Sequence, residues 1–146
     1  MKTIYSEQHR LRDAKTELHG GQLVTPFERP SRADTIIKAI GQSNLGDILE
    51  PETFAMDPVR AVHSDDFIAF LETAWQEWQD AGFTGEAIAS SWPARRMQSR
   101  LPDFIDGKIG YYALAAETSI TEGTWAAALA SKDVALTGAK ALLQGE

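Results

Sequence analysis

The sequence contains no cysteine among its 146 residues. This absence excludes a disulfide framework and any zinc site built from thiolates. Basic residues are also few, since 14 Lys and Arg stand against 21 Asp and Glu and give a formal net charge of −7. A nucleic-acid partner is therefore not expected, because phosphate backbones bind clustered Lys and Arg. The negative charge is compatible with a cationic ligand, although a mildly acidic charge is also ordinary for soluble proteins.

Long apolar runs are missing as well. No run of about 18 apolar residues occurs, and the segment from Met1 to Glu7 lacks the apolar core of a signal peptide. Hydrophobic residues make up 43% of the chain and include four Trp, six Phe and three Tyr, which is enough apolar surface for a packed core. We therefore expect a soluble, cytoplasmic, globular chain with no membrane partner.

Hydrophobic periodicity predicts several helices and very few strands. One short strand is expected at Lys2–Ser6 and a second at Asp47–Glu50. A C-cap glycine at Gly41 and an N-cap at Asp57 are expected from their positions beside the helical patterns. The predicted helices are Ser31–Gly41, a short one from Asp57, one from Ser64 to Gly82, Lys108–Thr118, and one from about Thr124 to Leu143.

Two long segments, residues 7–30 and 82–106, show no helical period because glycines and prolines interrupt them. Loops of this length inside a domain are usually functional or disordered. In an α/β arrangement a strand normally follows a helix such as the last one, and two strands are too few to cover these helices. The pattern predicts an incomplete chain that forms one segment, 1–146, of a larger α/β domain.

No complete catalytic site is visible in the sequence. The three histidines, His9, His19 and His63, have no metal-ligand spacing on a helix. A nucleophile elbow and a phosphate-binding loop are also missing. A three-ligand site assembled from scattered residues is left open, and His63, beside a predicted helix start, is expected to be structural.

Acidic residues in or near the irregular segments remain as candidates. Glu17 lies in the first long loop with Phe27 ten residues later, Asp103 and Asp106 close the second loop, and Glu117 follows near the end of the next predicted helix. Carboxylates bind amines through charge-assisted hydrogen bonds, and an aromatic face can cover an alkyl stem. These residue types would suit a polyamine. The alternative is that each acid is simply a solvated surface residue.

Several runs in the loops resemble one known family. Ser6-Glu7, His9, Leu11-Arg12, Ala14-Lys15-Thr16-Glu17-Leu18 and Gly20-Gly21 together are similar to the start of the bacterial acetylpolyamine amidohydrolases, which are zinc-dependent enzymes of the histone deacetylase superfamily. The resemblance extends over nearly the whole chain. It continues in Gly85-Glu86-Ala87-Ile88-Ala89, Ser91, Pro93, Arg95-Arg96, Ile109-Gly110-Tyr111-Tyr112, Ala115-Ala116-Glu117-Thr118 and Gly123-Thr124-Trp125.

The resemblance implies an arginase/deacetylase α/β fold, in which a parallel sheet is flanked by helices. This chain would be its N-terminal portion, mostly helices with one or two parallel strands and the two long loops. The family's zinc ligands, histidine pair and catalytic tyrosine lie further along the chain. Zinc polarises the acetyl carbonyl and activates water, and a histidine transfers protons. This chain is therefore expected to have no catalytic or metal-binding residue and to be inactive alone.

The resemblance also implies which residues bind substrate. Glu17 and Phe27 would line the substrate entrance formed by residues 7–30, and Asp106 and Glu117 would bind the ammonium groups of an acetylated polyamine. Asp106 stands where the family has Glu, and His19 stands where it has Tyr. The loop 82–106 would pair two subunits into a homodimer and narrow the entrance into a tunnel.

Two other interpretations of the chain are kept. It could be a non-catalytic polyamine-binding or regulatory module that pairs with a full-length homologue through residues 82–106. It could also be an unrelated helical scaffold, which would melt cooperatively as a monomer. The family interpretation instead predicts poor stability for the chain alone, because unpaired strand edges and bare helix faces would be exposed.

Overall fold

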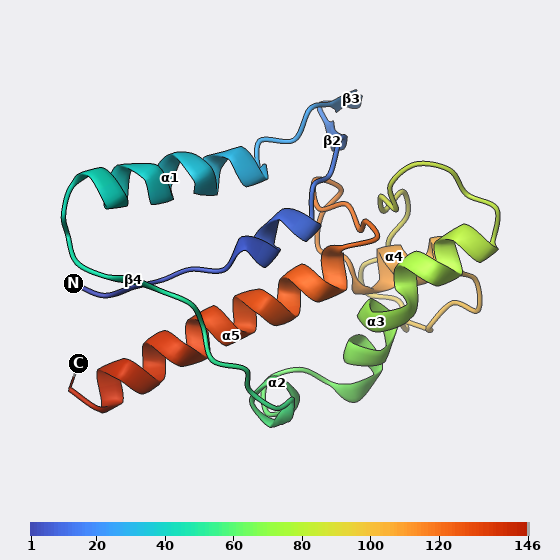
Figure 1. The fold of residues 1–146 in the computed structure, drawn as a ribbon. Helices are drawn as coiled ribbons and strands as arrows, with labels where there is room; N and C mark the ends of the chain where they lie inside the picture. The colour runs from blue at the N-terminus through green and yellow to red at the C-terminus, as the bar shows by residue number, and fades with distance from the viewer. Residues whose placement is uncertain (146) are drawn as a thin grey trace. The chain divides into compact units, whose positions relative to one another are not determined.

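A computed structural model describes residues 1–145 (Figure 1). The chain forms two compact units. Unit 1 comprises Met1–Asp13, Glu28–Val62 and Gly123–Glu146, and unit 2 comprises Ala14–Phe27 and His63–Glu122. Within residues 1–145, no helix has the length and apolar character needed to cross a membrane.

The sheet of unit 1 has two short parallel strands. Strand β1 (Thr3–Ile4) pairs with β4 (Ile48–Leu49), with Thr3 opposite Ile48 and Ile4 opposite Leu49. The backbone N–H of Tyr5 extends the pairing by donating to the Leu49 carbonyl at 2.9 Å. Both strands were predicted from the sequence, and the structure confirms them in shorter form.

Helix α5 (Thr124–Leu143) is the longest element of unit 1, and its bounds match the predicted helix. The 3-10 helix η1 (Glu7–Leu11) packs along it, as Figure 1 shows. The extended segment after β4 is hydrogen-bonded to side chains of α5. The Phe54 N–H donates to Asp133 Oδ1 at 2.9 Å, and Lys132 Nζ donates to the Phe54 carbonyl at 2.6 Å.

Helices α1 (Pro30–Gln42) and α2 (Asp57–Arg60) complete unit 1, and both confirm predicted helices. The predicted caps are wrong. Gly41 lies inside α1, whose C-cap is Ser43, and Asp57 is the first residue of α2, whose N-cap is Met56.

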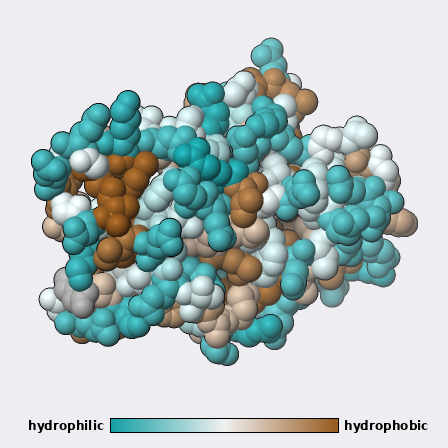
Figure 2. Space-filling view, viewed as in Figure 1, coloured by the Kyte–Doolittle hydropathy of each residue, from teal (hydrophilic) through white to brown (hydrophobic). Residues whose placement is uncertain are grey.

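The face of unit 1 shown in Figure 2 carries an apolar patch, drawn in brown in the region where Figure 1 places α1, β4 and the end of α5. Helix α1 has no buried residue, and the buried residues of α5 are small or polar. The exposed large apolar side chains of these three elements are Ile36, Ile48, Leu49, Leu142 and Leu143.

Unit 2 begins with a β-hairpin that was not predicted from the sequence. Strands β2 (Glu17–His19) and β3 (Gln22–Val24) pair antiparallel around the two-residue turn Gly20-Gly21. Both glycines have positive φ, +57° and +79°, which is the backbone that a type I′ hairpin turn requires. The glycine pair was interpreted as a breaker, so the prediction of one uninterrupted loop over residues 7–30 is wrong.

The core of unit 2 lies between α3 (Asp65–Asp80), α4 (Ile105–Tyr112) and the loop that joins them. Ala87 and Ile120 exchange two backbone hydrogen bonds of 3.0 and 2.9 Å, which close that loop against the segment after α4. Tyr112 stacks on Phe70 with 4.4 Å between ring centroids. The buried core consists of Phe70, Ala74, Ala87, Ala89, Ile105, Ile109 and Ile120.

Helix α4 differs from its prediction at both ends. It was expected at Lys108–Thr118, and it begins at Ile105 and ends at Tyr112. Ile105 is buried in the core, and the helix therefore begins three residues earlier in the sequence than predicted. At the other end Ala113 is extended, with φ −81° and ψ 140°, and its carbonyl accepts a hydrogen bond from Trp92 Nε1 at 3.1 Å. Residues 113–119 are therefore irregular.

Candidate functional site

All four predicted substrate-binding residues lie in unit 2. Glu17 is the first residue of β2 and is only 6% exposed. The alternative that Glu17 is a solvated surface acid is therefore wrong. A carboxylate shielded from water interacts more strongly with a nearby cation than a solvated one does, because the local dielectric constant is lower. Glu17 is in this respect the most suitable of the candidate acids.

A second acid fixes the backbone immediately before Glu17. The carboxylate of Glu86, in the second loop, accepts a hydrogen bond from the Thr16 N–H at 2.8 Å. It also accepts from the Lys15 N–H and from Thr16 Oγ1. No role for Glu86 was predicted from the sequence. Its position directly after Gly85 in an irregular segment offered no signal that it contacts Thr16, 70 residues away.

The segment that carries Glu117 also reaches this backbone. Ser119 is buried, and its Oγ donates to the Thr16 carbonyl at 3.3 Å. Glu117 itself is exposed and lies in the irregular stretch after α4. The prediction that it sits near the end of a helix is wrong. The structure nevertheless brings its segment against the residues that precede Glu17.

Phe27 and Asp106 have separate settings in unit 2. The Phe27 side chain is 66% exposed and meets the His19 ring edge to face, with centroids 5.9 Å apart. Asp106 is exposed in the first turn of α4, where its Oδ1 accepts from the Gly107 N–H at 2.8 Å. Asp106 was expected to close the loop, and the earlier start of α4 places it on the helix instead.

Two other carboxylates of unit 2 serve the packing of the helices. Lys108 Nζ lies 2.7 Å from Glu77 Oε2, and this hydrogen bond, with a second from Thr73, lowers the pKa of Glu77. The Tyr112 hydroxyl donates to Asp66 Oδ2 at 3.0 Å. Desolvation first, and then this hydrogen bond, raise the pKa of Tyr112 to about 12. These acids are already paired inside the protein and are poor candidates for ligand binding.

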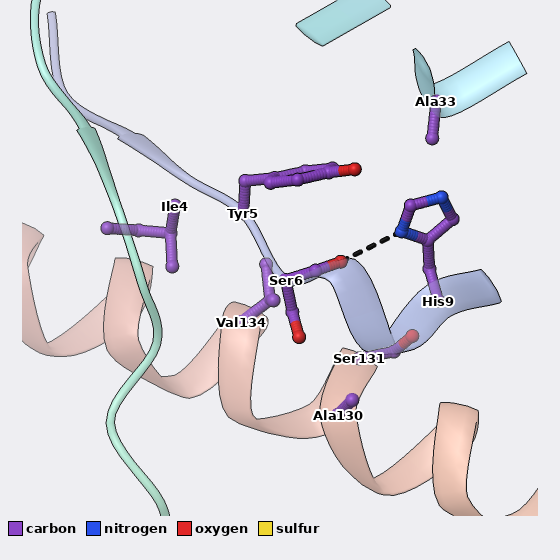
Figure 3. A pocket seen from close by; sticks show the side chains of 8 residues that line it. All are labelled: Ile4, Tyr5, Ser6, His9, Ala33, Ala130, Ser131 and Val134. Atoms are coloured by element: carbon purple, nitrogen blue, oxygen red, sulfur yellow. Dashed lines mark hydrogen bonds between the residues drawn. The ribbon is translucent and has the colours of Figure 1, made fainter. Parts of the chain in front are cut away.

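No metal centre is formed by residues 1–145, since no three or more His, Asp or Glu side chains come together there in a group that could hold an ion. All three histidines take part in ring contacts, His9 with Tyr5, His19 with Phe27 and His63 with Phe67. His9 also lines a cavity of ≈ 200 Å³ in unit 1 (Figure 3). Its Nδ1 lies 2.8 Å from the Ser6 carbonyl oxygen.

Sequence comparison identifies close relatives of the chain. No family model matches it. It is 49% identical to an acetylpolyamine amidohydrolase from Mycoplana ramosa over 99% of the chain, and 43% identical to acetylpolyamine amidohydrolase 2 from Pseudomonas aeruginosa over the same share. The chain is a homologue of the acetylpolyamine amidohydrolases. It spans 42% of the length of each of these two relatives.

The structural comparison agrees with the homology. A crystal structure of the acetylpolyamine aminohydrolase from Burkholderia pseudomallei matches the whole chain with a TM-score of 0.85 at 27% identity, and the chain covers 42% of that protein. The family resemblance and the fold predicted from the sequence, helices with few parallel strands, are confirmed. The unrelated helical scaffold is excluded as an interpretation.

Proposed function

We propose that this chain supplies the substrate-binding part of an enzyme that hydrolyses acetylpolyamines, or related acetylated amines, to a free amine and acetate. The observation that carries this proposal is the homology to acetylpolyamine amidohydrolases over almost the whole chain. The site in unit 2 supports it, because acids and an exposed aromatic ring are the groups that a slender cation with alkyl spacers would need.

Each residue has a separate task in the proposed site. Buried Glu17 would hold an ammonium group of the polyamine, with its charge little screened by water. Asp106 and Glu117 are exposed, so their attraction would act mainly by guiding the cation and would fall with added salt. The exposed ring of Phe27 would cover an alkyl segment of the substrate.

Zinc dependence and pairing of subunits belong to the proposal for the whole enzyme. Residues 1–145 provide no group of side chains that fits a zinc ion, so no step of the hydrolysis is assigned to them. We expect the chain alone to be catalytically inactive. Residues 82–106 are proposed to pair two subunits of the whole enzyme and to narrow the substrate entrance.

Titration of the 146-residue chain with spermidine in a calorimeter tests the binding proposal. We expect saturable binding that weakens with salt, and a loss of about tenfold in affinity, or about 1.4 kcal/mol, for Glu17→Gln. Glu72→Gln removes the same charge from an exposed position on α3 and is the matched control. An absence of saturable binding, or an equal loss in both variants, would contradict the proposal.

A non-catalytic role in polyamine binding or regulation is the second candidate. The observation that favours it is that unit 2 contains all four proposed binding residues and a core of its own. Size-exclusion chromatography of the chain mixed with an intact homologue tests the pairing that the regulatory role requires. Separate elution would contradict the regulatory role, whereas co-elution agrees with both functions, because both assign subunit pairing to residues 82–106. Release of acetate from acetylspermidine by the chain alone would contradict both.

A further inference from the structure

We propose that Glu86 is a positioning residue, whose carboxylate holds the start of strand β2 so that Glu17 is presented to a polyamine ammonium group. The inference rests on the proposed function, because it assumes that Glu17 binds the substrate. In the proposed site, Glu86 makes no contact with the substrate and acts only by positioning the backbone before Glu17.

The geometry of the Glu86 carboxylate matches this task. Its two oxygens receive the Lys15 N–H, the Thr16 N–H at 2.8 Å and Thr16 Oγ1. An ionised carboxylate has about four acceptor sites and no donor, so three donors can share it without competition. Hydrogen bonds to a charged acceptor are stronger than those to a neutral one. The two residues directly before Glu17 are therefore fixed by one side chain.

Glu86 itself is held in place by the core of unit 2. The next residue, Ala87, is fully buried and exchanges two backbone hydrogen bonds with Ile120. Ser119, adjacent to Ile120, donates to the Thr16 carbonyl at 3.3 Å. The backbone directly before β2 is thus bound at its N–H groups by Glu86 and at the Thr16 carbonyl by Ser119. Both partners come from segments that the core anchors.

The hydrogen bonds of Glu86 join the two loops, residues 7–30 and 82–106, to which the proposed function assigns different roles. Glu17 belongs to the segment proposed for the substrate entrance, and Glu86 belongs to the segment proposed for subunit pairing. A change in the second loop would therefore reach the substrate through the position of Glu17. A purely structural contact would alter the stability of unit 2 without a specific effect on the Glu17 site.

A double-mutant cycle on the 146-residue chain separates these two cases. Spermidine affinity is measured for the wild type, E86Q, E17Q and the double variant, with E72Q as the exposed control of equal charge change. The amide introduced by E86Q keeps one acceptor oxygen and loses the other. We expect E86Q to weaken binding about tenfold, and to weaken it by less than about twofold in the E17Q background, since residues that act through one contact are not additive.

Hydrogen exchange provides the direct structural readout. The Lys15 and Thr16 amides should exchange faster in E86Q than in the wild type, while the Ala87 and Ile120 amides keep their protection. E86D, which retains the carboxylate on a shorter arm, should be intermediate in both assays. It also replaces E86Q if that variant does not fold.

Three outcomes overturn the proposal. Losses from E86Q and E17Q that multiply would show independent actions, unchanged spermidine binding in E86Q would show no role at the site, and unchanged exchange at Lys15 and Thr16 would show that Glu86 does not hold β2. A failure of the proposed function looks different. In that case the wild-type chain binds no spermidine, while E86Q still accelerates exchange at Lys15 and Thr16.

Discussion

The two units of the chain bury their apolar side chains to very different extents. In unit 2, large side chains such as Ile109 and Phe70 are buried together with the alanines of the loop between α3 and α4. In unit 1, among the residues that the structure describes, burial is limited to Ala127, Ala130 and Thr137, all on α5. The apolar side chains of α1 and β4 remain accessible.

This difference shows what an amphipathic pattern does and does not predict. The periodic apolar residues of α1 predict a helix, and the helix forms, yet none of its residues is buried within the described chain. Helix α3 has the same kind of pattern, and several of its apolar residues are buried because α4 and the loop pack against them. Since burial of apolar area is the main stabilising contribution, unit 2 should hold most of the stability of this chain.

The largest expected contrast between the units comes from truncating one isoleucine in each. Ile109→Ala empties a site that is 1% exposed and should lower the free energy of unfolding by about 2–5 kcal/mol. Ile36→Ala, at a position 57% exposed on α1, should change it by no more than about 0.5 kcal/mol. Urea denaturation followed by tryptophan fluorescence measures both. Equal losses would contradict the assignment of the stable core to unit 2.

Two glycines test how closely the backbone is packed in each unit. A Cβ on Gly110 would lie 1.6 Å from the Ser91 carbonyl oxygen in unit 2, and one on Gly123 would lie 1.8 Å from the Leu11 carbonyl oxygen in unit 1. Both obstacles are backbone atoms, which cannot rotate away. Alanine at either position should cost about 1–3 kcal/mol, as overpacking does. The loss at Gly110 should be the larger, because Gly110 itself is buried, whereas Gly123 is only partly buried.

Gly138 in α5 is the control for both glycines, because a Cβ there meets no atom within 4 Å. Gly138→Ala should raise the stability by up to about 1 kcal/mol through its higher helix propensity. A loss at Gly138 of the size expected for Gly110 would mean that the substitutions act through glycine flexibility and not through close approach. Thermal melts of the three variants decide between these explanations.

Local sequence patterns predicted the regular elements well and their connections poorly. Helix α5 has the predicted bounds, because its apolar period and its start after Gly123 are local signals. Helix α4 was shifted, because its ends depend on Ile105 entering the core and on Trp92 binding the Ala113 carbonyl, both of which are tertiary contacts. The hairpin was predictable in principle, since two glycines between short extended segments are a known hairpin signal.

The candidate site was predictable only in its residue types. Acids and an aromatic ring in the loops suggested amine binding, but the burial of Glu17 could not be inferred, because Glu in an irregular segment is usually exposed. The role of Glu86 was also not predictable from the sequence. Its partners lie 70 and 71 residues away in the chain, and no period or spacing links positions at that distance.

Alkaline titration should distinguish Tyr112 from the other tyrosines. Its folded pKa of about 12 exceeds the ordinary value of 10.0. Because the folded pKa is raised, protonated Tyr112 contributes to the stability of the folded chain. This contribution is complete below pH 10 and is lost as the pH rises through about 12. Absorbance at the phenolate band should therefore show a late transition that Tyr112→Phe removes and Asp66→Asn moves to lower pH. A late transition that persists in Tyr112→Phe would contradict the assignment.

The smallest expected difference concerns one ion pair in each unit. Glu77 and Lys108 in unit 2 have side chains that are 37% and 25% exposed, whereas Glu52 and Lys140 in unit 1 are 55% and 43% exposed. The shortest N···O distance is 2.7 Å in both pairs, and Lys140 Nζ also lies 2.8 Å from the second oxygen of Glu52. Because water screens an exposed pair, we expect the greater exposure of the second pair to outweigh its additional contact. Double-mutant cycles should give about 0.5–1 kcal/mol for the first pair and a smaller value for the second.

The pH dependence of the Glu77 pair follows from the sign of its shift. Lys108 lowers the pKa of Glu77 from its ordinary value of 4.5, so the stabilisation is present above that pH and is lost as the pH falls through the lower, folded value. The stability difference between the wild type and Glu77→Gln should thus disappear in acid and be constant near neutral pH. A difference that persists after Glu77 is protonated would show that the side chain stabilises α3 by packing or by its hydrogen bond with Thr73, and not by its charge.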